Sequence, residues 1–179
     1  MSLFRLIVDR IVKTRNPILY WKKKGATIGD RCSIHGSADL GSEPYLIKIG
    51  DHVRINAGVS LVTHDGGLWV LRDMESLSTT VYQKADAFGR IQIGNNCHIG
   101  TNVFIMPGVT IGNNVVIGCG AVVTRNIPDN SVVAGVPARV IETIDEYAEK
   151  IANKIVPTKG MSPTEKKKYL TRNVNISMK

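Results

Sequence analysis

The fold of this chain is decided by residues 91–127, which read IQIGNNCHIGTNVFIMPGVTIGNNVVIGCGAVVTRNI. A large aliphatic residue returns there at every sixth position: Ile93, Ile99, Ile105, Ile111, Ile117 and Val123. A small or aliphatic residue follows each of these four positions later: Cys97, Val103, Val109, Val115, Ala121 and Ile127. Gly stands directly after the first aliphatic residue in four of the six units. A short repeat of constant period indicates a solenoid whose units stack on one another.

The six-residue period fits neither an amphipathic helix, which needs apolar residues three and four apart, nor a half-buried strand, which alternates. Short strands joined by tight turns satisfy it, because the aliphatic residue points inward and Gly or Asn permits the turn. Stacked turns of this kind pair their strands in parallel, about 4.8 Å apart. We therefore predict a parallel β-helix with a thin aliphatic core. An ordinary sandwich of short strands is the alternative, and the unbroken register disfavours it.

The composition agrees with a narrow solenoid. The 179 residues are enough for one domain with a core, and they are 43% hydrophobic but only 6% aromatic. The formal net charge is +8. Lys and Arg gather near the two ends, without a stripe of interleaved aromatic residues, so we expect no nucleic-acid partner. A phosphate-bearing cofactor or an anionic membrane surface would equally account for the positive charge.

The three cysteines, Cys32, Cys97 and Cys119, form no Cys-x-x-Cys pair, and an odd number does not suggest a disulfide framework. Cys32 and Cys97 occupy inward positions of the repeat, where we expect them to fill the core. A reduced, cytoplasmic setting fits this pattern. No apolar stretch is long enough to span a membrane, and Arg5, Asp9 and Arg10 interrupt the first segment too often for a secretion signal.

The chain divides into three predicted regions. Residues 1–24 form an N-terminal amphipathic helix that Pro17 ends or kinks; it either packs on the solenoid or a neighbouring subunit, or touches an anionic membrane at its inner face. Residues 25–141 form the β-helix, with an insertion around Ser42, Glu43 and Pro44 that resets the repeat and an excursion loop over residues 65–90. Residues 142–179 form a tail with helices over 142–154 and 163–170 and nine frayed final residues.

Four motifs carry a resemblance to a known family: Ile93-Gly94-Asn95-Asn96, Pro107–Gly112, Val122–Arg125 and the closing segment Ala134–Ile141, which reads AGVPARVI. Over residues 27–141 the chain resembles the hexapeptide-repeat acetyltransferases. It is similar to the maltose and galactoside O-acetyltransferases and to those of capsule and lipopolysaccharide assembly. The resemblance implies a left-handed coil, a homotrimer, and acetyl-CoA lying between adjacent subunits. The general preference of parallel crossovers for the right hand gives no support for that handedness.

Acyl transfer to a hydroxyl needs a base, and imidazole suits this role near neutral pH. Of the four histidines, only His64 stands where the solenoid breaks into the long excursion, and the resemblance implies that it is the catalytic base. A carboxylate or a backbone carbonyl would orient its ring, and the sequence does not choose between them. When the hydroxyl attacks the thioester, negative charge develops on the thioester carbonyl oxygen, and a backbone N–H would stabilise that charge. We expect the acetyl group to pass directly from the thioester to the acceptor. The alternative is a covalent route in which Cys119 carries the acetyl group, but nothing in the sequence activates that thiol.

Five further residues are implied as contacts of acetyl-CoA: Thr101 and Cys119 along the pantetheine arm, Thr124 and Arg125 near the nucleotide, and Arg139 at the phosphates. No metal is expected.

The acceptor is less well defined. In the excursion, Trp69, Arg72, Asp73 and Tyr82 either contact the acceptor or only hold the loop together. His98 stands where many relatives have Trp, which puts an acceptor pocket inferred from them in doubt and makes His98 a secondary contact.

The function predicted from the sequence is therefore an acetyl-CoA-dependent O-acetyltransferase that acts on a sugar or a lipid-linked or surface-polysaccharide precursor. An N-acetyltransferase or serine acetyltransferase on the same fold is one alternative. A zinc enzyme of the γ-carbonic-anhydrase kind is another, but the usual pair of histidines five residues apart is absent. A non-catalytic scaffold is the third.

Overall fold

The computed structural model describes residues 3–77 and 80–173, and the side chains of 3–8 and Thr80 lie outside that description. The chain divides between Tyr147 and Ala148 into two units, which are described separately. The first unit opens with helices α1 (Leu3–Arg15) and α2 (Pro17–Lys23), so the predicted break at Pro17 is confirmed. The predicted apolar face of the first helix rests partly on Leu3, Phe4, Ile7 and Val8, whose side chains lie outside the described part.

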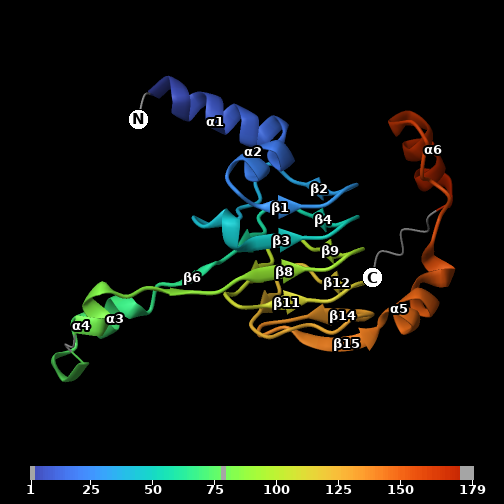
Figure 1. Ribbon diagram of the computed structural model, residues 1–179. Coiled ribbons are helices and arrows are strands. Elements are labelled where there is room, and N and C mark those ends of the chain that lie inside the picture. Colours follow the sequence, from blue (N-terminus) through green and yellow to red (C-terminus); the bar gives the residue numbers. More distant parts are fainter. Residues whose placement is uncertain (1–2, 78–79, 174–179) are drawn as a thin grey trace. The chain divides into compact units, whose positions relative to one another are not determined.

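The solenoid consists of three parallel sheets that wind around one core (Figure 1). The first, sheet A, stacks β1 (Thr27–Ile28), β3 (Ile47–Ile49), β8 (Ile91–Ile93) and β11 (Thr110–Ile111). Sheet B stacks β2 (Ser33–Ile34), β4 (Arg54–Ile55), β9 (His98–Ile99), β12 (Val116–Ile117) and β14 (Ser131–Ala134), with β15 (Arg139–Thr143) antiparallel at its end. Sheet C stacks β5 (Ser60–Leu61), β10 (Phe104–Ile105) and β13 (Val122–Val123). The prediction of a parallel β-helix is confirmed.

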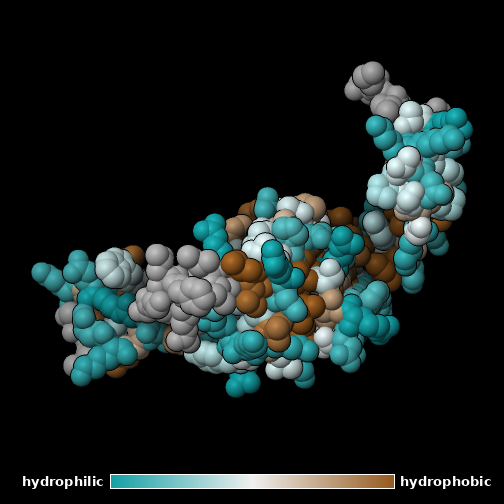
Figure 2. Space-filling model, turned by 90° about the horizontal axis from the view of Figure 1, so that it is seen from above, coloured by the Kyte–Doolittle hydropathy of each residue, from teal (hydrophilic) through white to brown (hydrophobic). Residues whose placement is uncertain are grey.

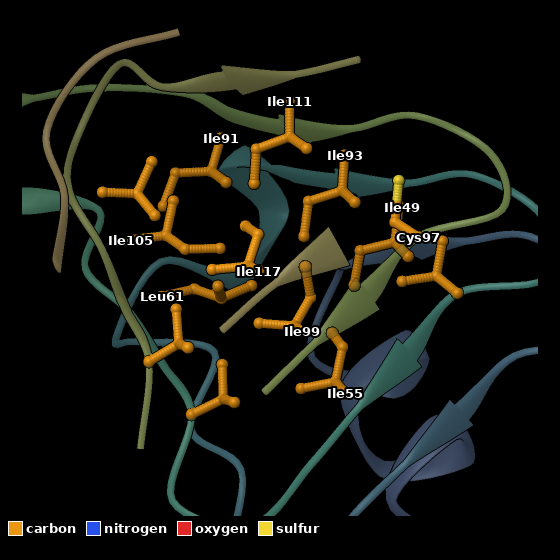
Figure 3. Packing of buried hydrophobic residues seen from close by; sticks show 14 of the residues in the cluster. Ile49, Ile55, Leu61, Ile91, Ile93, Cys97, Ile99, Ile105, Ile111 and Ile117 are labelled. Atoms are coloured by element: carbon orange, nitrogen blue, oxygen red, sulfur yellow. The ribbon is translucent and has the colours of Figure 1, made fainter. Parts of the chain in front are cut away.

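The core is the aliphatic set that the repeat predicts. Ile99, Ile105 and Ile117 are fully buried, and Ile93 and Ile111 nearly so. Figure 3 shows these side chains converging from the three sheets onto one another inside the coil. Each coil adds one layer of branched aliphatic side chains, and the dispersion attraction between closely stacked layers stabilises the core.

One corner of the coil explains why Gly follows the aliphatic residue in the sequence. There an Asp or Asn side-chain oxygen accepts a hydrogen bond from the backbone N–H one coil below, as between Asn95 N and Asn113 Oδ1 at 2.8 Å. The same bond recurs along the corner in four steps: Asp30 to Asp51, Asp51 to Asn95, Asn95 to Asn113 and Asn113 to Asp129. A Cβ on the preceding Gly would occupy the place of that oxygen and of the neighbouring backbone. Gly is therefore required at this position because there is no room for a Cβ atom.

Several predicted boundaries need correction. The excursion is not an open loop: β6 (His64–Asp65) and β7 (Ala87–Phe88) pair at its base, and α3 (Leu68–Arg72), a 3-10 turn (Glu75–Leu77) and α4 (Thr80–Lys84) lie beyond them. Figure 1 shows this segment leaving the stack of strands, and hydrophilic residues predominate on it in Figure 2. The strands resume at Ile91, directly after the predicted end of the excursion at residue 90. Cys32 is only half-buried, whereas Cys97 is buried as expected.

The end of the solenoid also differs from the prediction. Residues 131–134 do not leave the coil, because β14 pairs in parallel with β12, and only β15 turns back. The helix predicted over residues 142–154 is shorter: α5 covers Ile144–Ile151 and a 3-10 turn covers Ala152–Lys154. In the second unit α6 spans Pro163–Asn173, past the predicted end at Leu170, and residues 174–179 of the predicted frayed end lie outside the described part.

The crowding at the Gly corner gives a test of the fold. In Gly94→Ala the new Cβ would lie 2.6 Å from the carbonyl oxygen of Gly112, which belongs to the backbone of the next coil. We expect a loss of about 2 kcal/mol or more in the free energy of unfolding, measured by urea denaturation. Gly66→Ala is the matched control, because a Cβ there meets nothing within 4 Å. Equal stability of the two variants would contradict the steric role of Gly94.

Candidate active site

His64 stands at the corner where sheet C ends and the excursion begins. It belongs to β6, where it pairs with Phe88 of β7, and the two ring centroids lie 6.3 Å apart. The paired strand therefore fixes the backbone of His64. Its side chain is 48% exposed, so a substrate can reach the ring.

A carboxylate faces the His64 ring from the coil below. Glu43 Oε2 lies 3.4 Å from His64 Nδ1, and Ser42 Oγ lies 3.5 Å from the same nitrogen. The Glu43 side chain is only 16% exposed. Glu43 is thus a carboxylate placed where it can orient the His64 ring, a group that the sequence could not identify. Because Nδ1 faces this acid, Nε2 is the ring nitrogen left for a substrate.

Thr63 holds the Glu43 carboxylate in place. Its side chain is fully buried, and its hydroxyl donates to Glu43 Oε2 at 2.6 Å. This hydrogen bond is the main reason that the pKa of Glu43 lies below its ordinary value; burial opposes the shift, and Ser42 and His64 add to it. The carboxyl group is consequently kept charged next to the imidazole.

The three-residue insertion explains how Glu43 comes to lie beneath His64. Ser60 bridges to Asp39, and Leu61 N donates to Asp39 O at 2.9 Å, so the insertion falls one coil below the segment that leads to His64. Gly41 allows the close approach there: its φ is +69°, and a Cβ on it would lie 2.9 Å from Leu61 O. The three-residue insertion was visible in the sequence as an interruption of the six-residue repeat. Counting one coil back from His64 would have identified this insertion, and with it Glu43, as the neighbour of the ring.

A groove of about 520 Å³ opens next to His64. Small polar residues and the aliphatic Leu61 and Val62 line it, and Phe104, which is 44% exposed, adds an aromatic surface. The lining residues are Asp39, Gly41, Ser42, Ser60, Leu61, Val62, Thr63, His64 and Phe104. An acyl group and an acceptor can therefore meet beside the ring without entering the aliphatic core.

The predicted acetyl-CoA contacts fall in two places. Thr101 and Cys119 stack in the corner between sheets B and C, where Gly120 N donates to Thr101 O at 2.8 Å, and Cys119 is exposed. Thr124 and Arg125 follow β13 and are exposed, in the same corner as His64 but two coils away, which is about 10 Å.

Arg139 is exposed at the start of β15, and its Nη1 donates to Ala138 O at 2.9 Å. Ala138 N in turn donates to Val122 O at 2.8 Å, which joins this segment to the coil of β13. Only an extended ligand could touch all of these residues.

His98 is not brought to His64 within one protomer. It lies on sheet B, half-buried, with Nε2 3.4 Å from Asn56 Nδ2. Burial lowers its pKa, and the positive charge of Arg54 lowers it further. The neutral ring is therefore favoured, which weakens any role for His98 in binding an anion.

The predicted acceptor contacts of the excursion differ in their surroundings. Arg72 donates to Tyr82 O at 3.2 Å and to Ala85 O at 2.7 Å, and it also pairs with Asp86. Its donors therefore hold the excursion together. Trp69 is 78% exposed and Asp73 is exposed, whereas Tyr82 is half-buried.

Comparison with known proteins adds an independent finding. The family model described as "Bacterial transferase hexapeptide (six repeats)" matches residues 90–125. Protein CapG of Staphylococcus aureus is 48% identical over 152 residues, which cover 83% of this chain and 84% of CapG. The chain belongs to the hexapeptide-repeat acetyltransferase family. The left-handed β-helix of that family is accordingly its fold, and the predicted handedness is confirmed.

Galactoside acetyltransferase is similar over a shorter match in sequence and in a solved structure. Galactoside O-acetyltransferase of Escherichia coli K12 is 42% identical over 106 residues, or 58% of this chain, and the match spans 47% of that enzyme. A solved structure of galactoside acetyltransferase in complex with coenzyme A superposes with a TM-score of 0.58 at 27% identity, covering 82% of each chain.

The described residues offer neither a cluster of metal ligands nor a membrane-spanning helix. They contain no group of three His, Cys, Asp or Glu side chains that could hold a metal ion. None of the helices in residues 3–77 and 80–173 is long and apolar enough to cross a membrane.

The Thr63–Glu43 contact can be tested by pH. Since the pKa of Glu43 is lowered on folding, its stabilising effect is present above the pKa of the unfolded chain, about 4.3, and is lost as the pH falls through the lower folded value. Thr63→Val removes the bond at nearly constant volume. We expect the pKa of Glu43 to rise in a ¹³C NMR titration, and the difference in unfolding free energy between wild type and variant to shrink below about pH 4. An unchanged Glu43 pKa would show that Thr63 does not hold the carboxylate.

Proposed function

We propose that this protein is an acetyl-CoA-dependent O-acetyltransferase that acts on a hydroxyl of a sugar or surface-polysaccharide precursor. The observation that carries the proposal is the array of Thr63, Glu43 and His64 at an exposed corner of the coil. It is the arrangement that a general base requires: a reachable imidazole whose other nitrogen faces a fixed carboxylate. The names of the similar galactoside acetyltransferases support the reaction and the sugar acceptor.

The proposed chemistry uses one proton and one thioester. Nε2 of His64 accepts the proton of the acceptor hydroxyl as its oxygen attacks the thioester carbonyl carbon. The carbon–sulfur bond then breaks, and the imidazolium returns its proton to the thiolate, so the products are an acetyl ester and free coenzyme A. Glu43 stabilises the imidazolium that forms between these steps, because its negative charge lies 3.4 Å from Nδ1.

The residues on the later coils fit the thioester substrate. Cys119 and Thr101 present small side chains beside Gly120, whose Cα faces open space, so an extended arm can lie against that corner. Arg125 and Arg139 are exposed cations with no carboxylate partner over residues 3–77 and 80–173, as the phosphates of coenzyme A would require. When bound, acetyl-CoA supplies the activated acetyl group.

The acceptor and the assembly complete the proposal. The exposed Trp69 offers a flat apolar surface of the kind that packs on sugar rings, and we place the acceptor between the excursion and His64. The protein is proposed to be a homotrimer, in which the groove beside His64 faces a neighbouring subunit. That subunit would supply His98 from its sheet B or Cys119 from the corner between its sheets B and C.

The base is tested by His64→Ala. We expect turnover, followed as thiol release from acetyl-CoA with a panel of glycosides and amines, to fall at least about 100-fold. His52→Asn is the matched control, because the equivalent positions of later coils, Asn96 and Asn114, already hold Asn at the same positive φ. Activity of His64→Ala within a few-fold of the control would remove His64 from the reaction.

The orienting acid is tested by Glu43→Gln, which keeps the size of the side chain and an oxygen for the Thr63 hydroxyl. We expect kcat to fall about tenfold or more, with the KM for acetyl-CoA unchanged, because only the charge next to the imidazolium is lost. Glu43→Asp should recover part of the loss. A parallel change in KM, or no change in kcat, would assign Glu43 a purely structural role.

A further inference from the structure

A second groove, of about 750 Å³, lies between α1 and the outer face of sheet B at the first coils. Its shape is set by close packing: a Cβ on Gly36 would meet Thr14 O at 2.9 Å, so the end of α1 is seated directly on the coil. The lining residues are Arg10, Lys13, Thr14, Arg15, Pro17, Ser33, Ile34, His35, Gly36, Ser37, Arg54, Ile55 and Asn56. The helix and the sheet thus supply opposite walls.

The groove is strongly cationic. Arg10 and Arg15 come from the helix and Arg54 from β4, and none of the lining residues is Asp or Glu. Lys13 is engaged, because it lies 3.7 Å from Asp39 and 4.8 Å from the centre of the Trp21 ring. The three arginines, in contrast, form no ion pair with any carboxylate of residues 3–77 and 80–173.

The polar groups between the arginines add hydrogen-bond donors. Ser37 N donates to His35 Nδ1 at 3.2 Å, so the neutral His35 ring carries its hydrogen on Nε2. Ser37 Oγ is itself fixed by Gly58 N at 3.1 Å. Arg54 Nε donates to Asn56 Oδ1 at 3.3 Å, which orients the guanidinium and leaves its terminal nitrogens for a ligand.

We propose that this groove binds a phosphate-bearing molecule. Arginine donors match phosphate oxygens through their planar fork, and three guanidinium groups from two walls suit a group with two or more negative charges. The volume of the groove leaves room for a molecule larger than inorganic phosphate, and the ligand we propose is either a soluble phosphate ester or a lipid headgroup. Within one protomer the groove lies on sheet B and α1, away from the corner of His64. In the proposed trimer it would come near a neighbour's His64, because Arg54 pairs with His98 on sheet B. The test below therefore measures phosphate binding by itself, without acetyl transfer.

The test is pyrophosphate binding to the full chain, measured by calorimetry in low salt and by the rise in melting temperature that binding produces. In Arg10→Gln/Arg54→Gln we expect the dissociation constant to rise at least about tenfold, because charge-assisted hydrogen bonds from two walls are lost. Lys48→Gln/Lys166→Gln is the control with the same net charge, since both lysines are exposed and lie outside the groove. Arg15→Gln is a second variant should the double variant unfold.

Vesicle sedimentation separates the two sources of phosphate. Binding to phosphatidylcholine vesicles with phosphatidic acid, but not to phosphatidylcholine alone, with loss in the groove variants, would support the proposal and identify a lipid headgroup. Pyrophosphate binding without vesicle binding would support it and identify a soluble ester. If the control variant weakened pyrophosphate binding as much as the groove variant, the effect would be one of net charge. If the groove variants dissociated an oligomer, carboxylates of another copy would be the groups that fill the groove. Either result, or no pyrophosphate binding by wild type, would overturn the proposal.

Discussion

The hydrogen bonds between successive coils impose the constraint on which the rest of the structure depends. Each strand donates to the strand next to it in its sheet, as Gly94 N does to Ile111 O at 2.9 Å, so equivalent residues of successive coils must lie in line. The aliphatic core and the Asp and Asn corner follow from this alignment, and the placement of Glu43 below His64 depends on it together with the three-residue insertion. A side chain in such a fold acquires its neighbours from its position within the coil, and only secondarily from its place in the chain.

This alignment is why so much of the fold could be predicted from the sequence. The buried positions from Ile93 to Val123 are those that the six-residue repeat selects, and the excursion leaves the coil at His64 as expected. The ends were harder, because β14 and β15 lie where the repeat stops: Val132 and Val133 continue sheet B without a further aliphatic six residues on. The helices of the excursion lacked a periodic apolar face, so pattern reasoning treated them as loop.

The candidate site was predicted only in part. His64 could be singled out because it marks a break in a regular pattern, and its catalytic role stays a prediction. Glu43 was not singled out, because its relation to His64 depends on how a three-residue insertion is absorbed between two coils. Arg72 shows the opposite limit: its type suggested ligand binding, but its partners Tyr82 and Ala85 lie ten or more residues away and no spacing rule connects them. The outward side of each coil, including the cationic groove, follows no repeat.

The pairing at the base of the excursion has a consequence for the history of the protein. His64 lies opposite Phe88, and Gly89 N donates to Thr63 O at 2.9 Å, so the two ends of the excursion meet as neighbours at one level of the coil. Anything inserted between them leaves the solenoid above and below undisturbed. Selection can therefore lengthen, trim or replace this segment while the folding of the scaffold is spared, and a new preference for a partner molecule can arise without a new protein architecture.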